Sequence, residues 1–157
     1  MASDIFFIFC LDNCRYALRL AAVERATRAA AVTPLPEYAG NILGVINVHG
    51  EIMPVVNTRR VFGLPEREII PDDMFIIVNT SVRNVILVAD SVEQIAGFGD
   101  GKMTKGADII PEYPHIESIA TLDNGIVIIH NLEHCLAGEL NASYEWPEAP
   151  PVATNAE

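Results

Sequence analysis

The sequence has few positive charges and no long hydrophobic run. Its 157 residues include 10 Lys and Arg against 21 Asp and Glu, which gives a formal net charge of −11. Nucleic-acid binding needs clustered Lys and Arg that displace counterions from phosphates, so we expect no nucleic acid as a partner. No stretch approaches the roughly 20 apolar residues of a membrane-spanning helix, so we expect no direct insertion into a membrane.

Cysteine is also scarce, with Cys10, Cys14 and Cys135 at irregular spacing. An odd number of cysteines without a regular framework indicates reduced thiols rather than structural disulfides. The N-terminal stretch MASDIFFIF places an acidic residue before its apolar run and lacks the basic region of a secretory signal. We therefore predict a cytoplasmic protein. We also expect it to be monomeric when free.

What the sequence does contain is a series of short apolar runs separated by turn residues. Runs of four to seven residues of this kind predict β-strands, and paired runs around a turn predict hairpins. Four predicted pairs are Ile5 to Leu11 with Tyr16 to Leu20, Leu43 to Val48 with Ile52 to Val56, Met74 to Asn79 with Val85 to Val88, and Ile116 to Leu122 with Ile126 to Ile129. Their turns contain Asp12-Asn13, His49-Gly50-Glu51, a polar loop and Asp123-Asn124-Gly125.

Helices are predicted to be few and short, around Ala21 to Ala26, after Asn57 in TRRVFG, and over Leu132 to Ala137. A parallel α/β sheet needs long crossover helices, so the pattern favours an all-β fold of small barrels or a sandwich. The connector PEREIIPDD, residues 65–73, divides the strands into two groups. Residues 141–157 contain three prolines and no Lys or Arg, and we predict a disordered acidic tail.

The stretch HNLEHC, residues 130–135, matches the H-x-x-E-H pattern of a zinc protease. In such enzymes both histidines lie on one helix face, but His130 follows the predicted strand GIVIIH. We therefore favour a strand end, an N-cap at Asn131 and a short helix that buries Leu132 and Leu136. A small zinc hydrolase using His130, Glu133 and His134 is the alternative.

Other short stretches lack the context that chemistry requires. Asp90-Ser91 has no glycine elbow before the serine, and GFGDGK, residues 97–102, is followed by Met103 rather than the Ser or Thr of a phosphate loop. Cys10 lies in an apolar run and is predicted to be a core residue, whereas Cys14 lies beside a turn. We expect no catalytic residue, no metal and no cofactor.

The ordered set of motifs resembles the CheW adaptor family. GVINVHGEIMPVVNTRRVFG is similar to the family pattern G-V-x-N-L-R-G-x-I-x-P-V-x-D-L-R. FFIFCLDNCRYALRLAAVERA, LPEYAGNILGV, VILVADSVEQI and IATLDNGIVIIHNLEHCL follow the family in the same order, from about Ile5 to Leu136. The resemblance implies two five-stranded SH3-like β-barrels with a shared hydrophobic core, a first over about 14–64 and a second over about 72–136 with the N-terminal strand near it, in a single domain over residues 1–140.

The resemblance also implies function. CheW-like adaptors are not enzymes; they couple the cytoplasmic tip of methyl-accepting chemoreceptors to the regulatory domain of a CheA-type histidine kinase. The receptor-facing positions of the family fall on Val23, Arg25, Gly44, Asn47, Val48, His49, Gly50, Val92 and Ile95. Apolar anchors with a polar rim suit a helix held in a groove, and Gly44 and Gly50 would let a partner backbone approach. Plain hairpin packing and, for Val92 and Ile95, core packing are the alternative interpretations.

Two positions depart from the family pattern. His49 replaces the usual Arg, so a contact to a receptor carboxylate would be weaker and would depend on pH. Asn57 replaces the usual Asp, so an ion pair with a nearby Arg such as Arg59 would become a neutral hydrogen bond. These departures motivate a second hypothesis, an adaptor that regulates a kinase and no longer binds receptors.

Overall fold

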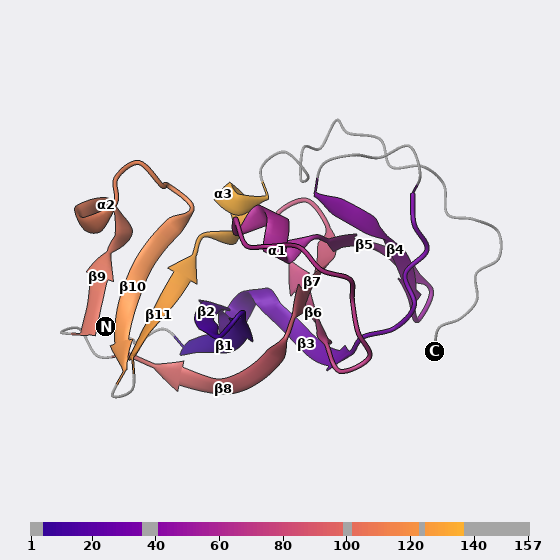
Figure 1. The fold of residues 1–157 in the computed structure, drawn as a ribbon, viewed down its shortest axis with the longest axis horizontal. Helices are drawn as coiled ribbons and strands as arrows, with labels where there is room; N and C mark the ends of the chain where they lie inside the picture. The colour runs from indigo at the N-terminus through magenta and orange to yellow at the C-terminus, as the bar shows by residue number, and fades with distance from the viewer. Residues whose placement is uncertain (1–4, 36–40, 99–101, 123–124, 137–157) are drawn as a thin grey trace.

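The strands form two mostly antiparallel sheets that lie side by side (Figure 1). The structure is a computed structural model, and it describes residues 5–35, 41–98, 102–122 and 125–136. One sheet has five strands in the order β3-β6-β7-β5-β4: β3 (Val23–Arg28), β4 (Ile42–Val48), β5 (Glu51–Val56), β6 (Met74–Asn79) and β7 (Asn84–Ala89). The other has six strands in the order β8-β1-β2-β11-β10-β9: β1 (Ile5–Leu11), β2 (Cys14–Arg19), β8 (Ser91–Gly97), β9 (Met103–Lys105), β10 (Ile116–Leu122) and β11 (Gly125–His130).

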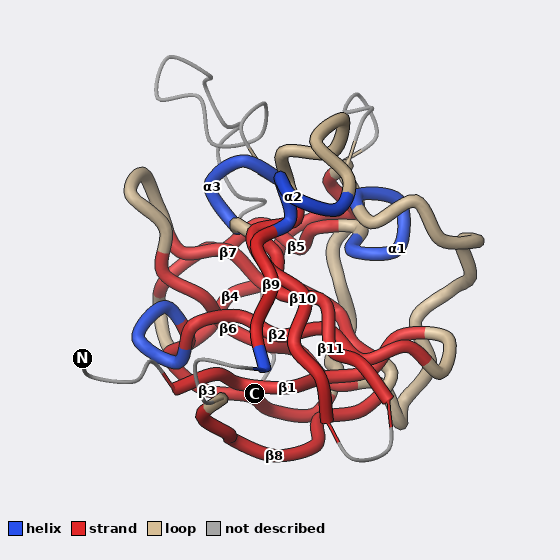
Figure 2. The backbone as a smooth tube through the Cα atoms, turned by 90° about the vertical axis from the view of Figure 1, so that its left-hand side faces the viewer, coloured by secondary structure: helices blue, strands red, loops and turns tan. Residues whose placement is uncertain are grey.

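Helices are short and lie outside the sheets. They are α1 (Thr58–Val61), α2 (Gly106–Ile109), α3 (Leu132–Cys135) and the 3₁₀ turn η1 (Leu20–Ala22). Figure 2 shows α1, α2 and α3 at the same end of the strands. The helices predicted after Asn57 and from Leu132 are confirmed, and the side chains of Asn57 and Asn131 cap them by accepting from the backbone N–H of Arg60 and His134.

The hairpin turns follow from residues that tolerate positive φ. Asp12 and Asn13 have φ of 52° and 68°, and they join β1 to β2. His49 and Gly50 have φ of 51° and 92°, and they join β4 to β5 with Val48 opposite Glu51. A two-residue turn with both φ values positive matches the right-handed twist of the flanking strands. All four predicted hairpins are confirmed, although Asp123 and Asn124 lie outside the described residues.

The core consists of three clusters, and one of them joins the two sheets. Phe6 and Ile8 face a cluster inside the six-stranded sheet, and Val55 and Phe75 face one inside the five-stranded sheet. The third cluster combines Phe7, Phe9, Leu11, Tyr16 and Leu18 of β1 and β2 with Ile42, Val56, Ile76, Val78, Val85, Leu87 and Ala89 of β4 to β7. Successive residues of β1 thus pack on different clusters. The predicted all-β fold with a shared core is confirmed, and one sheet has six strands because β9 extends it.

The helix predicted around Ala21 to Ala26 is wrong, because this region is η1 followed by strand β3. Val23 and Ala26 both pack against the shared cluster, a spacing of three that imitates a helix. The pairing of β3 with β6 shifts register between Val23 and Arg25, which is a β-bulge. The extra residue brings Val23 and Ala26 to the same face of the strand. Pairing with β6 therefore overrides the helix propensity of the alanines.

Sheet membership also differs from the predicted barrel boundaries. Strands β6 and β7 follow the connector but complete the sheet of β3 to β5, and β5 pairs with β7 in parallel. Within the six-stranded sheet, β2 pairs with β11, also in parallel. The chain therefore changes sheets between β2 and β3 and again between β7 and β8. The predicted tail, residues 141–157, lies outside the described residues.

Candidate functional site

A network of ion pairs holds the two sheets together where β7 passes into β8. Asp90, the single residue between these strands, accepts two hydrogen bonds from Arg59 of α1, at 2.7 and 2.8 Å, and one from Arg67 of the connector at 2.7 Å. Arg59 also donates to Asp12 in the β1–β2 turn at 2.6 Å, and Arg67 pairs with buried Asp73 at 2.8 Å. The network thus links a turn of one sheet to a helix of the other.

The Asp90 carboxylate is committed to this network. Burial opposes its ionisation, but the backbone N–H of Asp12 and the guanidinium groups of Arg59 and Arg67 outweigh burial and lower the pKa of Asp90. A carboxylate held ionised by two arginines is a poor general base. The interpretation of Asp90-Ser91 as structural is therefore consistent with its contacts.

The role expected for Asn57 is wrong. The Asn57 side chain caps α1 and donates to Glu66 at 3.0 Å, whereas Arg59 binds Asp12 and Asp90. The neutral hydrogen bond expected between Asn57 and Arg59 is replaced by ion pairs to carboxylates distant in the sequence. At Asn57 the structure therefore shows a helix cap and a hydrogen bond to Glu66 rather than a contact with Arg59.

Four of the predicted site residues lie on strands β3 and β8, which meet at the junction of the sheets. We call Val23, Arg25, Val92 and Ile95 the junction face. Val23 and Val92 are half-buried and pack against the shared cluster, Arg25 is exposed, and Ile95 is 57% exposed. Of these four residues, Val92 lines a cleft of about 280 Å³, together with Arg28, Asp72, Met74, Asp90 and Ser91.

Four others, Asn47, Val48, His49 and Gly50, form the tip of the β4–β5 hairpin. The Asn47 side chain accepts a hydrogen bond from the backbone N–H of Gly50 at 2.7 Å, which fixes the turn. Val48 packs against the cluster inside the five-stranded sheet, and His49 and Gly50 are exposed. The hairpin tip and the junction face thus rest on different core clusters, and the described contacts do not bring them together.

The role expected for Gly44 is also wrong. A Cβ at Gly44 would lie 2.2 Å from the backbone oxygen of Thr33 and 2.7 Å from Val32. Thr33 and Val45 exchange two backbone hydrogen bonds at 2.9 Å beside it. The space that glycine leaves is therefore filled by this chain's own segment, and no partner backbone can enter there.

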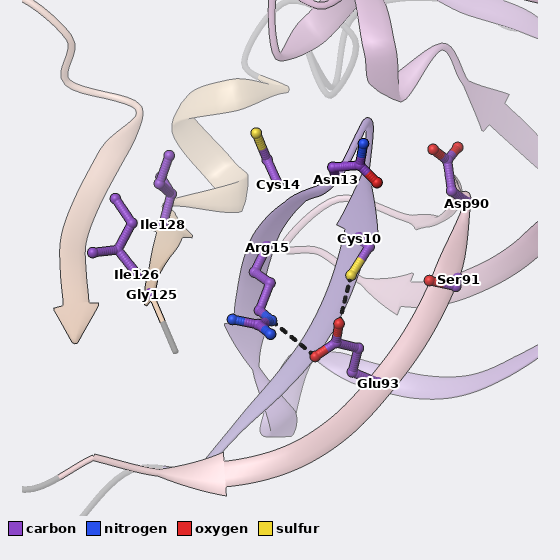
Figure 3. A pocket seen from close by; sticks show the side chains of 10 residues that line it. All are labelled: Cys10, Asn13, Cys14, Arg15, Asp90, Ser91, Glu93, Gly125, Ile126 and Ile128. Carbon is purple, nitrogen blue, oxygen red and sulfur yellow. Dashed lines mark hydrogen bonds and ion pairs between the residues drawn. The ribbon is translucent and has the colours of Figure 1, made fainter. Parts of the chain in front are cut away.

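A pocket of about 580 Å³ opens beside β1, β2, β8 and β11 (Figure 3). Here the Cys10 thiol donates to Glu93 at 2.8 Å, and Arg15 pairs with the same carboxylate at 3.0 Å. Cys10 is half-buried rather than a core residue as predicted, because its side chain points toward Glu93 of β8. Burial and the hydrogen bond to Glu93 raise the pKa of Cys10 to about 11, so the thiol is a poor nucleophile.

The HNLEHC stretch forms a strand end and a short helix, as predicted. His130 ends β11 and stacks on Phe62, with ring centroids 4.0 Å apart and planes within 7°. Its Nδ1 lies 3.3 Å from the Cys135 sulfur. Burial, together with the nearby charge of His115, lowers the pKa of His130 to about 4, which keeps the ring neutral. Leu132 and Leu136 are buried, as expected for this helix.

Glu133 and His134, the other members of the zinc alternative, face elsewhere. Glu133 accepts hydrogen bonds from the backbone and the hydroxyl of Ser81, at 2.9 and 2.8 Å, and His134 is exposed. Within the described residues, no group of three or more His, Cys, Asp or Glu side chains is placed to hold a metal ion. No helix in the described part of the chain has the length and apolar character needed to cross a membrane.

Comparisons with known proteins agree with this fold. Residues 6–139 match the family model of the CheW-like domain. Over 140 residues the chain is 24% identical to the chemotaxis protein CheW of Rhizobium meliloti, covering 89% of this chain and 86% of that protein. The chemotaxis protein CheW of Bacillus subtilis is 31% identical over 71 residues, 45% of this chain and 46% of that protein. The crystal structure of the scaffolding protein TtCheW from Thermoanaerobacter tengcongensis superposes with a TM-score of 0.78 and 25% identity, covering 90% of this chain and 96% of that one.

The chain belongs to the CheW-like domain family. Its match extends from β1 to beyond α3 and includes both sheets and the network at their junction. Family membership makes it an adaptor or scaffold protein of the chemotaxis type. Sequence reasoning had pointed to this family, but it had missed Arg59, Arg67 and Asp90 as a structural unit. Arg59 and Arg67 follow the β4–β5 hairpin in the sequence, but nothing in the sequence indicates that their partners are Asp12, Asp73 and Asp90.

Proposed function

We propose that this protein is a cytoplasmic, non-enzymatic adaptor that couples methyl-accepting chemoreceptors to a CheA-type histidine kinase. Free in solution it is a monomer. It binds the helical cytoplasmic tip of the receptor and the regulatory domain of the kinase, and it uses no cofactor. The relatives named chemotaxis proteins and the similar scaffolding protein support this assignment.

The observation that carries the proposal is the junction face beside its cleft. Val92 lines the cleft, Ile95 is 57% exposed further along β8, and the rim carries Arg28 and Asp72, which form an ion pair at 3.7 Å. Apolar anchors with a charged rim are what an amphipathic helix recognises in a groove. In the free protein the exposed isoleucine side chain is in contact with water, which is unfavourable. Burying it under a partner is therefore stabilising.

The network at Asp90 gives the junction face its rigidity. Strand β8 starts one residue after Asp90, and β3 pairs with β6, which follows Asp73. The arginines that bind Asp90 and Asp73 therefore fix both strands relative to each other. A binding surface held in its bound geometry loses less entropy when the partner docks.

The test is reconstitution from purified components. The protein is mixed with a receptor cytoplasmic fragment and the histidine kinase from the same cell, and co-sedimentation and kinase autophosphorylation are measured. We expect all three to co-sediment and autophosphorylation to rise only when all three are present. Binding to the kinase without binding to the receptor would instead support the kinase-only adaptor, and binding to neither would contradict the proposal.

A further inference from the structure

Strand β8 has one extra residue in its pairing with β1. Ile95 lies opposite Phe7 and Val92 lies opposite Phe9, so three steps along β8 match two steps along β1. An insertion of this kind is a β-bulge. Residues three apart in a regular strand point to opposite faces. Because Phe7 and Phe9 share a face of β1, the bulge places Val92 and Ile95 on one face as well.

The packing of β8 agrees with this change of face. Val92 packs against the cluster shared by both sheets, whereas Ala96 packs against the cluster inside the six-stranded sheet. Residues four apart would lie on one face of a regular strand, so the bulge is what separates these two. It also brings Ile95, which is 57% exposed, to the same side as Val92. The two apolar residues that β8 contributes to the junction face therefore lie together because of the bulge.

Glu93 lies within the bulge, and side chains of β1 and β2 hold its carboxylate (Figure 3). The Cys10 thiol donates to one carboxylate oxygen at 2.8 Å, and Nε of Arg15 donates to the other at 3.0 Å. Cys10 and Arg15 lie opposite each other in the β1–β2 hairpin, so one carboxylate connects three strands. The Glu93 side chain is 34% exposed and that of Arg15 is 22% exposed, which shields the pair partly from water. The bulge is therefore held at the face opposite to Ile95.

We propose that Glu93 is a positioning residue of the junction face, and that Cys10 and Arg15 act through it. The contacts of its carboxylate hold the bulge, and the bulge holds Ile95 beside Val92. Without these contacts, regular pairing beyond Val92 would turn Ile95 to the opposite face of the sheet. A receptor helix that needs both apolar side chains would then find them together in only a fraction of the molecules, and its apparent affinity would fall accordingly.

The consequence for receptor binding rests on the proposed function, whereas the effect on the pairing of β8 does not. Two measurements on the full-length protein keep them apart. Amide hydrogen exchange reports the pairing of each strand, and titration with a receptor signalling fragment reports the affinity.

In Glu93→Ala and in Cys10→Ala we expect the amides of β8 to exchange about tenfold faster than in the original protein. The amides of β4 and β5, in the other sheet, should keep their rates, and receptor affinity should fall severalfold. Cys10→Ser keeps a hydrogen-bond donor, so both quantities should stay within about twofold of the original. Ile126→Ala truncates a 55% exposed side chain that lines the same pocket, and as a matched control it should change neither quantity.

Three results would overturn the proposal. Unchanged exchange of β8 in Glu93→Ala would show that core packing alone holds the bulge. Equally faster exchange in both sheets would show that Glu93 acts on global stability rather than on position. Faster exchange confined to β8 with unchanged receptor affinity would show that the receptor does not depend on the bulge. If the original protein binds no receptor fragment, the proposed function fails, and exchange in β8 still decides whether Glu93 holds the bulge.

Discussion

The junction face and the hairpin tip differ in what holds their residues in place. At the junction, ion pairs from Arg59 and Arg67 to Asp90 and a cluster shared by both sheets fix strands that are far apart in the sequence. At the hairpin tip, His49 and Gly50 are fixed by a local turn and one hydrogen bond from Gly50 to Asn47. Loss of the buried contacts at the junction should therefore lower stability, whereas changes to exposed side chains of either region should act mainly on binding.

The largest effect is expected from Gly44→Val, at the base of the hairpin rather than its tip. The new side chain would have to occupy the space of the Thr33 backbone oxygen, which lies 2.2 Å from the position of a Cβ. We expect a loss of about 3 kcal/mol or more in the free energy of unfolding, or failure to fold, in chemical denaturation.

The control at the hairpin tip is Gly50→Ala. Gly50 has a φ of 92°, but nothing lies within 4 Å of its Cβ position. The cost should be about 1 kcal/mol, from backbone strain alone. Equal losses for the two glycines would show that the tip is as tightly built as the base.

Arg59→Ala should disrupt the junction. The Arg59 side chain is 11% exposed and pairs with both Asp12 and Asp90, so its removal takes this cation from Asp12 and leaves Asp90 with Arg67 alone. We expect a loss of about 3 kcal/mol in denaturant unfolding. The neighbouring Arg60 is 53% exposed, and Arg60→Ala should cost at most about 0.5 kcal/mol. Similar losses of stability for the two variants would show that the network is not the source of junction stability.

Acid should lower the free energy of unfolding through protonation of His130. Its pKa is about 4 in the folded protein and 6.5 without burial, so the unfolded chain binds more protons between these values. Stability should be fully present above pH 6.5 and fall as the pH drops toward 4, by up to about 3 kcal/mol. His130→Leu should flatten this part of the pH profile of the unfolding free energy. Asp90, whose pKa is lowered, contributes a further loss at still lower pH.

The smallest effect on stability is expected at the hairpin tip. His49→Arg restores the residue usual in the family and adds a permanent planar cation at an exposed position. Stability should stay within about 0.5 kcal/mol of the original, while receptor binding improves severalfold. Denaturant unfolding and titration calorimetry with a receptor fragment check the two values. A change in folding stability without a change in binding would contradict a binding role for the tip.

The parts of the fold that were predicted from sequence are those fixed by neighbours in the chain. The turns at Asp12-Asn13 and His49-Gly50 and the cap at Asn131 depend on local conformational preferences and local hydrogen bonds. Strand β3 was misjudged because a bulge gave it a helix-like spacing. The membership of β6 and β7 depends on the parallel pairing of β5 with β7, which no local pattern reveals.

The candidate site was predictable to a similar extent. The family pattern pointed to residues of β3, β4 and β8, and the structure divides them between two places. The partners of Arg59 lie 47 and 31 positions away in the sequence, at Asp12 and Asp90. The neighbours of Gly44 come from the segment that closes the sheet against β4. These contacts depend on tertiary structure, so spacing in the sequence could not reveal them.

The most direct measurement is the affinity of a receptor signalling fragment for the protein and for two variants, Ile95→Glu and His49→Glu. Ile95 is 57% exposed, so both variants should keep the melting temperature of the original. If the junction face holds the receptor helix, Ile95→Glu should weaken binding by a factor of about ten or more, and His49→Glu should weaken it less. Unchanged binding by Ile95→Glu, with binding lost in His49→Glu, would contradict the junction face as the receptor site.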